Sequence, residues 1–254
     1  MEQASKANTL DIPDQKRNVL YQVSLLQGLT YGDYYGSVAI GELKQHGDTG
    51  IGTFNRLNGE LIMLDGKVYR AAGGGNIEAV TDDETTPFAV AAFMDVNASR
   101  KFTEIPDSDA LYDELDRMVE ARGKNRFYIV RIDGMFRKMH VRSVYAQREP
   151  YRRLVEVLEK EQTFYNYENM EGTMVGLYCP FYMSALNAAG WHFHFISKDK
   201  TRGGHVLGVQ IAEAVSAWAD IDAFEVKLPQ NEMFAGFDLT VDQSKDIEKV
   251  EKNT

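Results

Sequence analysis

Residues 190–205 read GWHFHFISKDKTRGGH, with aromatic residues and histidines in alternation over the first part. Successive side chains of a β-strand point to opposite faces of the sheet. The pattern therefore predicts a strand whose aromatic face packs into a core and whose other face, with His192 and His194, opens on a cavity. The pair Gly203-Gly204 allows the chain to reverse, which would return His205 on a neighbouring strand.

Three imidazoles that converge from two paired strands suit a divalent metal ion. Three protein ligands leave a coordination position open, which is typical of catalytic rather than structural zinc sites. Histidine ligands favour zinc, with other first-row metals possible. Two alternatives stay open on this pattern alone: the histidines are satisfied core or surface groups, or they form a structural metal site.

Two further stretches carry charged residues on predicted strands. Residues 60–64 and 67–70 flank Asp65-Gly66, a strong hairpin signal, and Glu60 shares a face with two aliphatic residues. Residues 127–132 and 135–144 flank Asp133-Gly134 and predict a second hairpin, with Arg142 on its return strand. Between them, the apolar spacing over residues 108–122 predicts a helix. An inward glutamate near an arginine is also compatible with a structural ion pair.

Taken together, these motifs resemble the acetolactate decarboxylase family. The resemblance lies in the GTFxxLxGELI pattern of residues 52–62, the Asp65-Gly66 turn followed by Tyr69-Arg70, the strand that carries Arg142, and residues 190–206. It runs in order from about residue 18 to the end of the chain.

The resemblance implies a fold, an activity and an assembly. The fold is α+β, with two subdomains of mixed or antiparallel β-sheet flanked by helices. The chain's own residues add the expected organisation: a flexible N-terminal segment (residues 1–17), a mixed-sheet domain (18–149) and a metal-binding sheet domain with a C-terminal tail (150–254), with Glu149-Pro150 as the linker. The activity is the decarboxylation of 2-acetolactate to acetoin and carbon dioxide by a zinc-dependent homodimer.

The family's functional residues carry over by motif. His192, His194 and His205 match the metal ligands, Glu60 and Arg142 match charged residues of the active site, and Thr53 matches a hydroxyl residue that lines it. Glu251 matches a C-terminal carboxylate that reaches back toward the metal, although Glu248 is close enough to take that place. His140 departs from the family's pattern, in a way that would alter the wall of the pocket.

The chemistry of the reaction fits these residue types. Loss of carbon dioxide leaves an electron pair that the adjacent ketone must accept as an enediolate, and zinc on the ketone and hydroxyl oxygens would stabilise that charge. No motif for thiamine or pyridoxal is evident. The planar fork of Arg142 suits a carboxylate, and Glu60 suits a general acid or base.

Composition narrows the possible partners. The formal net charge of −10 argues against nucleic acid and anionic membrane surfaces, because both need a basic face. No run of about 18 apolar residues is present, so no membrane span is expected. The single cysteine, Cys179, has no basic neighbour or second thiol, so neither a nucleophile nor an internal disulfide is expected, and a cytoplasmic location follows.

Two other classes of function remain compatible with the histidine pattern. One is a different three-histidine metalloenzyme, either a hydrolase or a cupin-like oxygenase. A cupin usually adds a glutamate soon after the histidine pair, where this chain has Asp199 and Lys200. The other is a non-enzymatic binding module in which zinc is a structural clamp.

Overall fold

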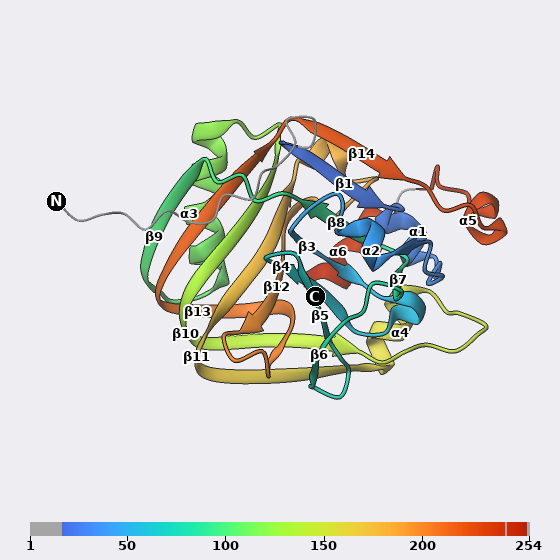
Figure 1. Ribbon diagram of the computed structural model, residues 1–254, viewed down its shortest axis with the longest axis horizontal. Coiled ribbons are helices and arrows are strands. Elements are labelled where there is room, and N and C mark those ends of the chain that lie inside the picture. The colour runs from blue at the N-terminus through green and yellow to red at the C-terminus, as the bar shows by residue number, and fades with distance from the viewer. Residues whose placement is uncertain (1–16, 242, 253–254) are drawn as a thin grey trace.

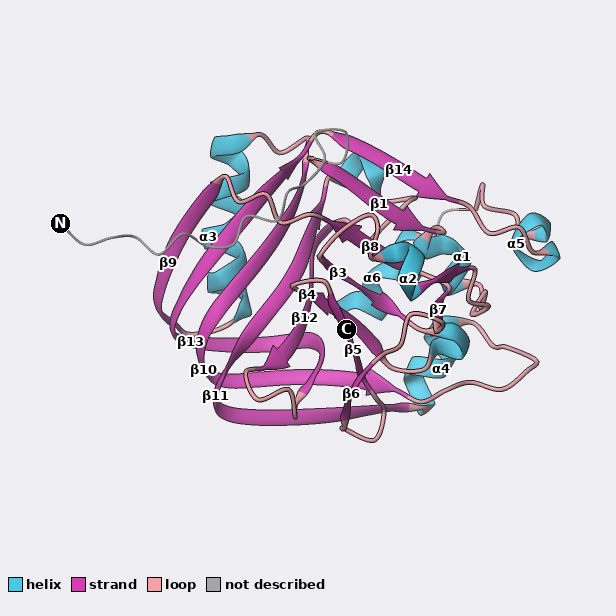
Figure 2. Cartoon of the chain, viewed as in Figure 1, coloured by secondary structure: helices cyan, strands magenta, loops and turns pink. Residues whose placement is uncertain are grey.

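The computed structural model describes residues 17–241 and 243–252 and has the predicted α+β architecture. The predicted flexible segment, residues 1–17, lies outside the described residues except for Arg17. Strands dominate the molecule, as Figure 2 shows. Among the described helices, none has the length and apolar character that a membrane span requires.

The elements follow one another in the order of their labels in Figure 1. The strands are β1 (Val19–Val23), β2 (Val38–Ala39), β3 (Thr49–Thr53), β4 (Glu60–Leu64), β5 (Lys67–Ala71), β6 (Ile77–Ala79), β7 (Thr85–Thr86), β8 (Ala89–Ala92), β9 (Ala98–Ile105), β10 (Phe127–Val144), β11 (Gln162–Cys179), β12 (Gly190–Ser197), β13 (Gly203–Ile221) and β14 (Ala223–Lys227). The helices are α1 (Leu26–Thr30), α2 (Ile40–Leu43), α3 (Ser108–Arg122), α4 (Leu154–Lys160), α5 (Glu232–Gly236) and α6 (Ser244–Lys252), with short 3-10 turns at Asn55–Leu57 and Phe181–Met183.

Two sheets stack on each other. In the described part of the chain, one sheet has the order β14-β1-β8-β3-β4-β5-β6 and the other the order β10-β11-β12-β13-β9. A shared apolar layer joins them, with Ile51 and Ile62 from the first sheet and Leu177 and Ile196 from the second. Stacked sheets bury one face each in this way.

Both sheets take strands from each side of residue 149. The strands β9 and β10 belong to the five-stranded sheet, and β14 belongs to the seven-stranded sheet. The predicted linker at residues 149 and 150 therefore does not separate the two sheets. A division of the chain into domains at that point stays a prediction.

The five-stranded sheet curls around a second core. Besides its neighbour β11, strand β10 also pairs with β13, which brings the sheet back on itself. Phe193 and Phe195 lie in this core together with Leu111 and Leu115 of α3. The aromatic face predicted for residues 190–197 is therefore confirmed, and so is the helix over residues 108–122, which Asp107 caps by accepting a hydrogen bond from the Ala110 amide at 2.9 Å.

The second predicted hairpin is wrong. Residues 127–144 form one continuous strand that runs through Asp133-Gly134, with β11 on one side and β13 on the other. A Cβ atom at Gly134 would lie 2.3 Å from the carbonyl oxygen of Glu213. The glycine is thus needed for close approach of a neighbouring strand, and an Asp-Gly pair alone does not distinguish this need from a turn.

Three short helices form a separate apolar cluster at the side of the molecule away from α3 (Figure 1). Helices α1, α4 and α6 contact one another and bury Leu26, Leu158 and Val250. Ion pairs hold α6 in place, with Arg153 at 2.8 Å from Asp246 and Lys249 at 2.6 Å from Glu159. The C-terminal helix thereby packs against α4, and it also contacts α1 from the early part of the chain.

Candidate metal centre

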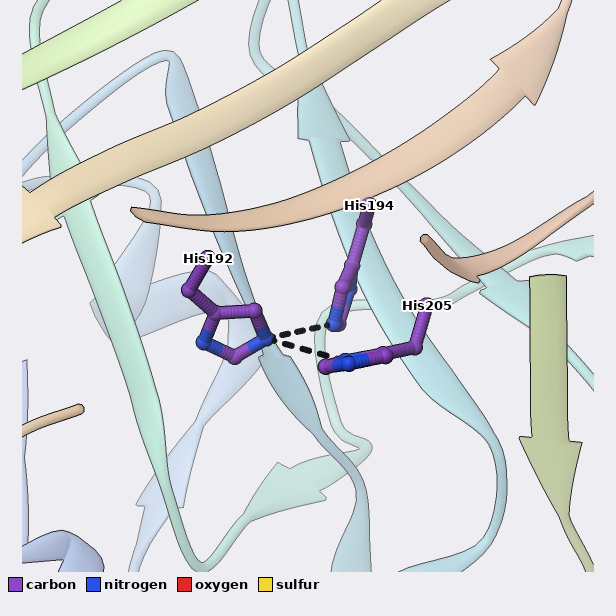
Figure 3. A group of neighbouring side chains, drawn as sticks. All are labelled: His192, His194 and His205. Atoms are coloured by element: carbon purple, nitrogen blue, oxygen red, sulfur yellow. Dashed lines mark hydrogen bonds between the residues drawn. The ribbon is translucent and has the colours of Figure 1, made fainter. Parts of the chain in front are cut away.

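Three histidines meet at the point where β12 and β13 pair. His194 lies directly opposite His205 in the register of the two strands, and His192 lies two residues before His194 on the same face. The Nε2 atom of His192 is 3.2 Å from Nε2 of His194 and 3.1 Å from Nδ1 of His205 (Figure 3). The predicted convergence of these three imidazoles is confirmed.

The spacing of these nitrogens fits a shared cation. Zinc–nitrogen bonds of about 2.0–2.1 Å in a tetrahedron place two ligand nitrogens about 3.3 Å apart. The Nδ1 atom of His194 is 2.8 Å from the carbonyl oxygen of Leu61, to which it donates, so its Nε2 atom carries a lone pair. Such a second contact, which fixes the tautomer, is usual for metal-binding histidines.

Burial keeps two of the three imidazoles, those of His192 and His194, neutral. His194 and His205 are 1% and 4% exposed. Desolvation, together with the positive charge of Arg142, lowers the pKa of His192 to about 3. Desolvation also holds the pKa of His194 well below its usual value. Only a neutral imidazole binds a metal ion, so these side chains are ready to do so at neutral pH.

The prediction that Gly203-Gly204 reverses the chain is wrong, because both glycines lie within β13 opposite β12 and residues 198–202 make the reversal. Gly204 instead allows the close approach of a neighbouring strand just before His205. Its φ of +150° is rarely open to other residues, and a Cβ atom there would lie 2.5 Å from the carbonyl oxygen of Arg142. We expect Gly204→Ala to lower the free energy of unfolding by about 1–3 kcal/mol from backbone strain alone, with the steric clash adding to this. Urea denaturation measures the change.

Gly236→Ala is the matched control for that substitution. A Cβ atom at Gly236 meets nothing within 4 Å. If Gly204→Ala were as stable as Gly236→Ala, the conformation assigned to Gly204 would be contradicted.

Strands β3 and β4 bring a carboxylate and a hydroxyl to the histidines. Glu60 and Thr53 lie opposite each other in the register of these strands, and both are buried. The Oε2 atom of Glu60 is 3.6 Å from Nε2 of His194. The hydroxyl of Thr53 donates to the carbonyl oxygen of Gly59 at 2.8 Å. The structure thus places both predicted residues beside the histidine cluster.

Strand β10 contributes the arginine. Arg142 lies opposite His205 in the β10–β13 register and is 3% exposed. It lines the same cavity as the three histidines, Glu60 and Thr53. His140, two residues earlier, is not among the residues that line this cavity. Its Nδ1 atom is 2.8 Å from Oδ1 of Asn166, so the expected change in the pocket wall does not occur there.

The rest of the cavity wall is apolar and was not predicted from the sequence. It comes from segments far apart in the chain, chiefly helices α1, α4 and α6 and the loops beside β3 and β8. These wall residues are Leu26, Leu29, Leu57, Phe88, Val144, Leu154, Leu158 and Val250. The cavity therefore has a polar part, with the histidines, Glu60 and Arg142, and an apolar wall.

The predicted C-terminal carboxylate cannot be placed in the site. Glu251 lies in α6, but its side chain is outside the described residues, as is that of Glu248. Val250, the neighbour of Glu251, does line the cavity.

Cys179 is buried, and burial raises the pKa of its thiol to about 12. A thiol with so high a pKa is a poor nucleophile.

The fold and this site define an α+β protein with a buried three-histidine centre suited to a metal ion. Comparison with known proteins then gives the family. The family model for alpha-acetolactate decarboxylase matches residues 20–241. The chain belongs to the alpha-acetolactate decarboxylase family and is an enzyme of that family.

Individual relatives agree over most of their length. The chain is 38% identical over 226 residues to the alpha-acetolactate decarboxylase of Brevibacillus brevis, covering 88% of this chain and 78% of the relative. It is 34% identical to that of Bacillus licheniformis over 100% of this chain and 99% of the relative. The crystal structure of alpha-acetolactate decarboxylase from Bacillus subtilis strain 168 matches with a TM-score of 0.88 and 33% identity, covering 92% of this chain and 99% of that one.

Proposed function

We propose that this enzyme converts 2-acetolactate to acetoin and carbon dioxide with a divalent metal ion, zinc, held by His192, His194 and His205. One observation carries the proposal: the three imidazoles, Glu60 and Arg142 line a single buried cavity. The names of the relatives supply the substrate. The charge on Arg142 explains how an anion is accepted by a chain with a net charge of −10.

The residues present fit such a metal ion. Nitrogens 3.1–3.2 Å apart, a tautomer fixed by Leu61 and the neutral imidazoles of His192 and His194 all suit a cation with an open coordination position. When bound, the ion would polarise the ketone and hydroxyl oxygens of the substrate and stabilise the negative charge that develops as carbon dioxide leaves.

The protein's own groups have separate tasks. Arg142 binds and orients the carboxylate of the substrate until it is lost. Glu60, close to His194, moves the proton that the carbinol carbon must gain to complete acetoin. Thr53 holds the loop before Glu60 in place through its bond to Gly59. For Glu251 the family resemblance is the only support for a role as the carboxylate that reaches toward the metal, with Glu248 as the alternative.

We expect Arg142→Lys to reduce kcat/KM about 10- to 100-fold, with most of the effect in KM. Lysine keeps the charge but loses the fork that holds both carboxylate oxygens, and a hydrogen bond to a charged group contributes about 1.5–3 kcal/mol. Steady-state kinetics with 2-acetolactate measure the change. Arg131→Lys, which alters an arginine paired with Asp65 and Asp133 outside the cavity, is the control. Equal kinetics for the two variants would remove Arg142 from substrate binding.

The direct test of the proposed reaction is its stoichiometry. Purified protein incubated with racemic 2-acetolactate should release one carbon dioxide for each acetoin formed. Absence of acetoin from folded, zinc-loaded protein would overturn the proposal. Ester hydrolysis or oxygen consumption by the same preparation would instead indicate a three-histidine hydrolase or oxygenase.

We further propose a homodimer located in the cytoplasm. The family resemblance supports the dimer, and a single buried cysteine is compatible with a reducing compartment. Light scattering should give a mass twice that of one chain, and a monomeric mass at assay concentration would contradict the dimer. Fractionation of cells that produce the protein should place it in the cytoplasmic fraction.

A further inference from the structure

A second pocket reaches the histidines from the side of α3. We call it the α3 pocket; it has a volume of about 420 Å³ and is lined by residues of α3, of the start of β12 and of β13. His192 and His205 line the α3 pocket and also the cavity that holds all three histidines, here called the histidine cavity. Two of the three histidines therefore adjoin both spaces.

A break in the strand pairing makes room for the α3 pocket. Strand β13 pairs with β12 over residues 203–205 and with β9 from Ile211 onward. Between these stretches, no strand of the described chain pairs with this edge of β13. The amide of Val209 donates instead to the hydroxyl of Ser108 in α3, at 3.1 Å. The break is thus bounded by a helix, whose side chains leave a pocket where a strand would have closed the sheet.

The α3 pocket is negatively charged. Asp109 and Asp116, both exposed on α3, line it, and its described lining residues include no lysine or arginine. The carboxylate of Asp116 also accepts a hydrogen bond from the indole of Trp191 at 2.7 Å, directly before His192 in the chain. A cleft lined by charge of one sign concentrates ions of the opposite sign and repels those of the same sign. This pocket therefore favours cations over the anionic substrate.

The histidine cavity has a different balance of charge. Arg142 lines it, and Glu60 is the one carboxylate among its described lining residues, so these two charges cancel. The rest of its wall is apolar, and a hydrated cation gains no replacement there for the water that it must lose. The guanidinium of Arg142 attracts a carboxylate and repels a metal ion. The two spaces thus differ in the charge that they admit.

We propose that the metal ion reaches and leaves the three histidines through the α3 pocket, while the substrate uses the histidine cavity. This inference rests on the metal centre of the proposed function. Asp109 and Asp116 concentrate the cation in the pocket, and His192 and His205 are the ligands that it meets first.

Ala189→Trp tests the route by filling it. Ala189 lines the α3 pocket, is half-buried and lies in the turn before β12. Zinc uptake by the metal-free protein should slow about tenfold or more, because association rates vary over about 1–3 decades among variants of one binding site. Stopped-flow mixing with a fluorescent indicator of free zinc measures uptake, and mixing with a chelator measures release. Release should slow by the same factor, since an obstructed path hinders both directions. Ala189→Ser is the matched control and should keep both rates.

The double variant Asp109→Asn Asp116→Asn tests the charge of the route. Asparagine keeps an oxygen that can accept from Trp191 but removes both negative charges. Zinc uptake at low ionic strength should slow about three- to tenfold, and the difference should vanish in 1 M salt, where screening acts within about 3 Å. Asp113→Asn Glu120→Gln is the matched control, because it removes two exposed charges from α3 that do not line the pocket.

The outcomes separate the route from the metal centre. Wild-type rates of zinc uptake in folded Ala189→Trp would overturn the route, and so would slower uptake with unchanged release, which indicates damage to the ligands. If Ala189→Trp does not fold, the charge variants decide, and equal uptake by the two double variants would overturn the route. The zinc-loaded variants should keep the wild-type KM for 2-acetolactate, and a raised KM would show that the substrate uses the α3 pocket. Wild-type protein that takes up no zinc would instead overturn the metal centre.

Discussion

His194→Ala should leave the protein folded, remove its stoichiometric metal and reduce turnover at least about a thousandfold. The Nε2 atom of His194 is 3.2 Å from Nε2 of His192, and the Leu61 carbonyl fixes the tautomer of His194. A metal ion provides several kcal/mol of charge stabilisation in reactions of this type, and each 1.36 kcal/mol corresponds to a factor of ten in rate. Atomic absorption gives the metal content per chain, and acetoin formation gives the rate.

His140→Ala is the control for this substitution. His140 stacks on Phe164 and lies outside the cavity. It should retain one metal ion per chain and wild-type turnover. Full activity in metal-free His194→Ala would refute the assignment of His194.

Glu60→Gln should reduce turnover about 100- to 10,000-fold while the metal content stays at one ion per chain. Glutamine keeps the size of the side chain but cannot exchange a proton, and general acid–base catalysis contributes a factor in this range. The three imidazoles remain to hold the metal. Rate and metal content are measured on the same preparation.

Glu171→Gln is the control, because Glu171 pairs with the exposed Lys198 and does not line the cavity. It should behave as the wild type. Unaltered turnover in Glu60→Gln would exclude Glu60 from proton transfer. Loss of the metal in Glu60→Gln would show instead that its carboxylate helps to hold the ion.

Local sequence patterns predicted the part of the site that lies on neighbouring strands. His192, His194 and His205 are close in sequence, and strand alternation with one short reversal is enough to bring them together, although residues 198–202 and not the predicted Gly203-Gly204 make that reversal. The β4–β5 hairpin and helix α3 were likewise predictable, because their turn and capping residues act locally. Glu60, Thr53 and Arg142 entered through family motifs, since no local rule brings β3, β4 and β10 to one cavity.

The remaining features depend on contacts between distant segments. Gly134 looks like a turn residue, yet the approach of Glu213 determines its place in a long strand. The apolar wall needs α1, α4 and α6 to pack together, which no periodicity in such short helices indicates. The left-handed backbone at Arg56 and Leu57 is held by hydrogen bonds that Arg56 makes with Tyr34 and Gln147, and neither arginine nor leucine gives a signal for this conformation.

The central claim is that a metal ion on His192, His194 and His205 is required for decarboxylation. The most direct measurement is a zinc titration of chelated, metal-free protein, with acetoin formation and circular dichroism recorded at each step. We predict that chelation abolishes turnover while the fold is retained, and that turnover returns linearly up to one zinc ion per chain. Metal-free, folded protein that still forms acetoin at the original rate would contradict the claim, and loss of the fold on chelation would point to zinc as a structural clamp.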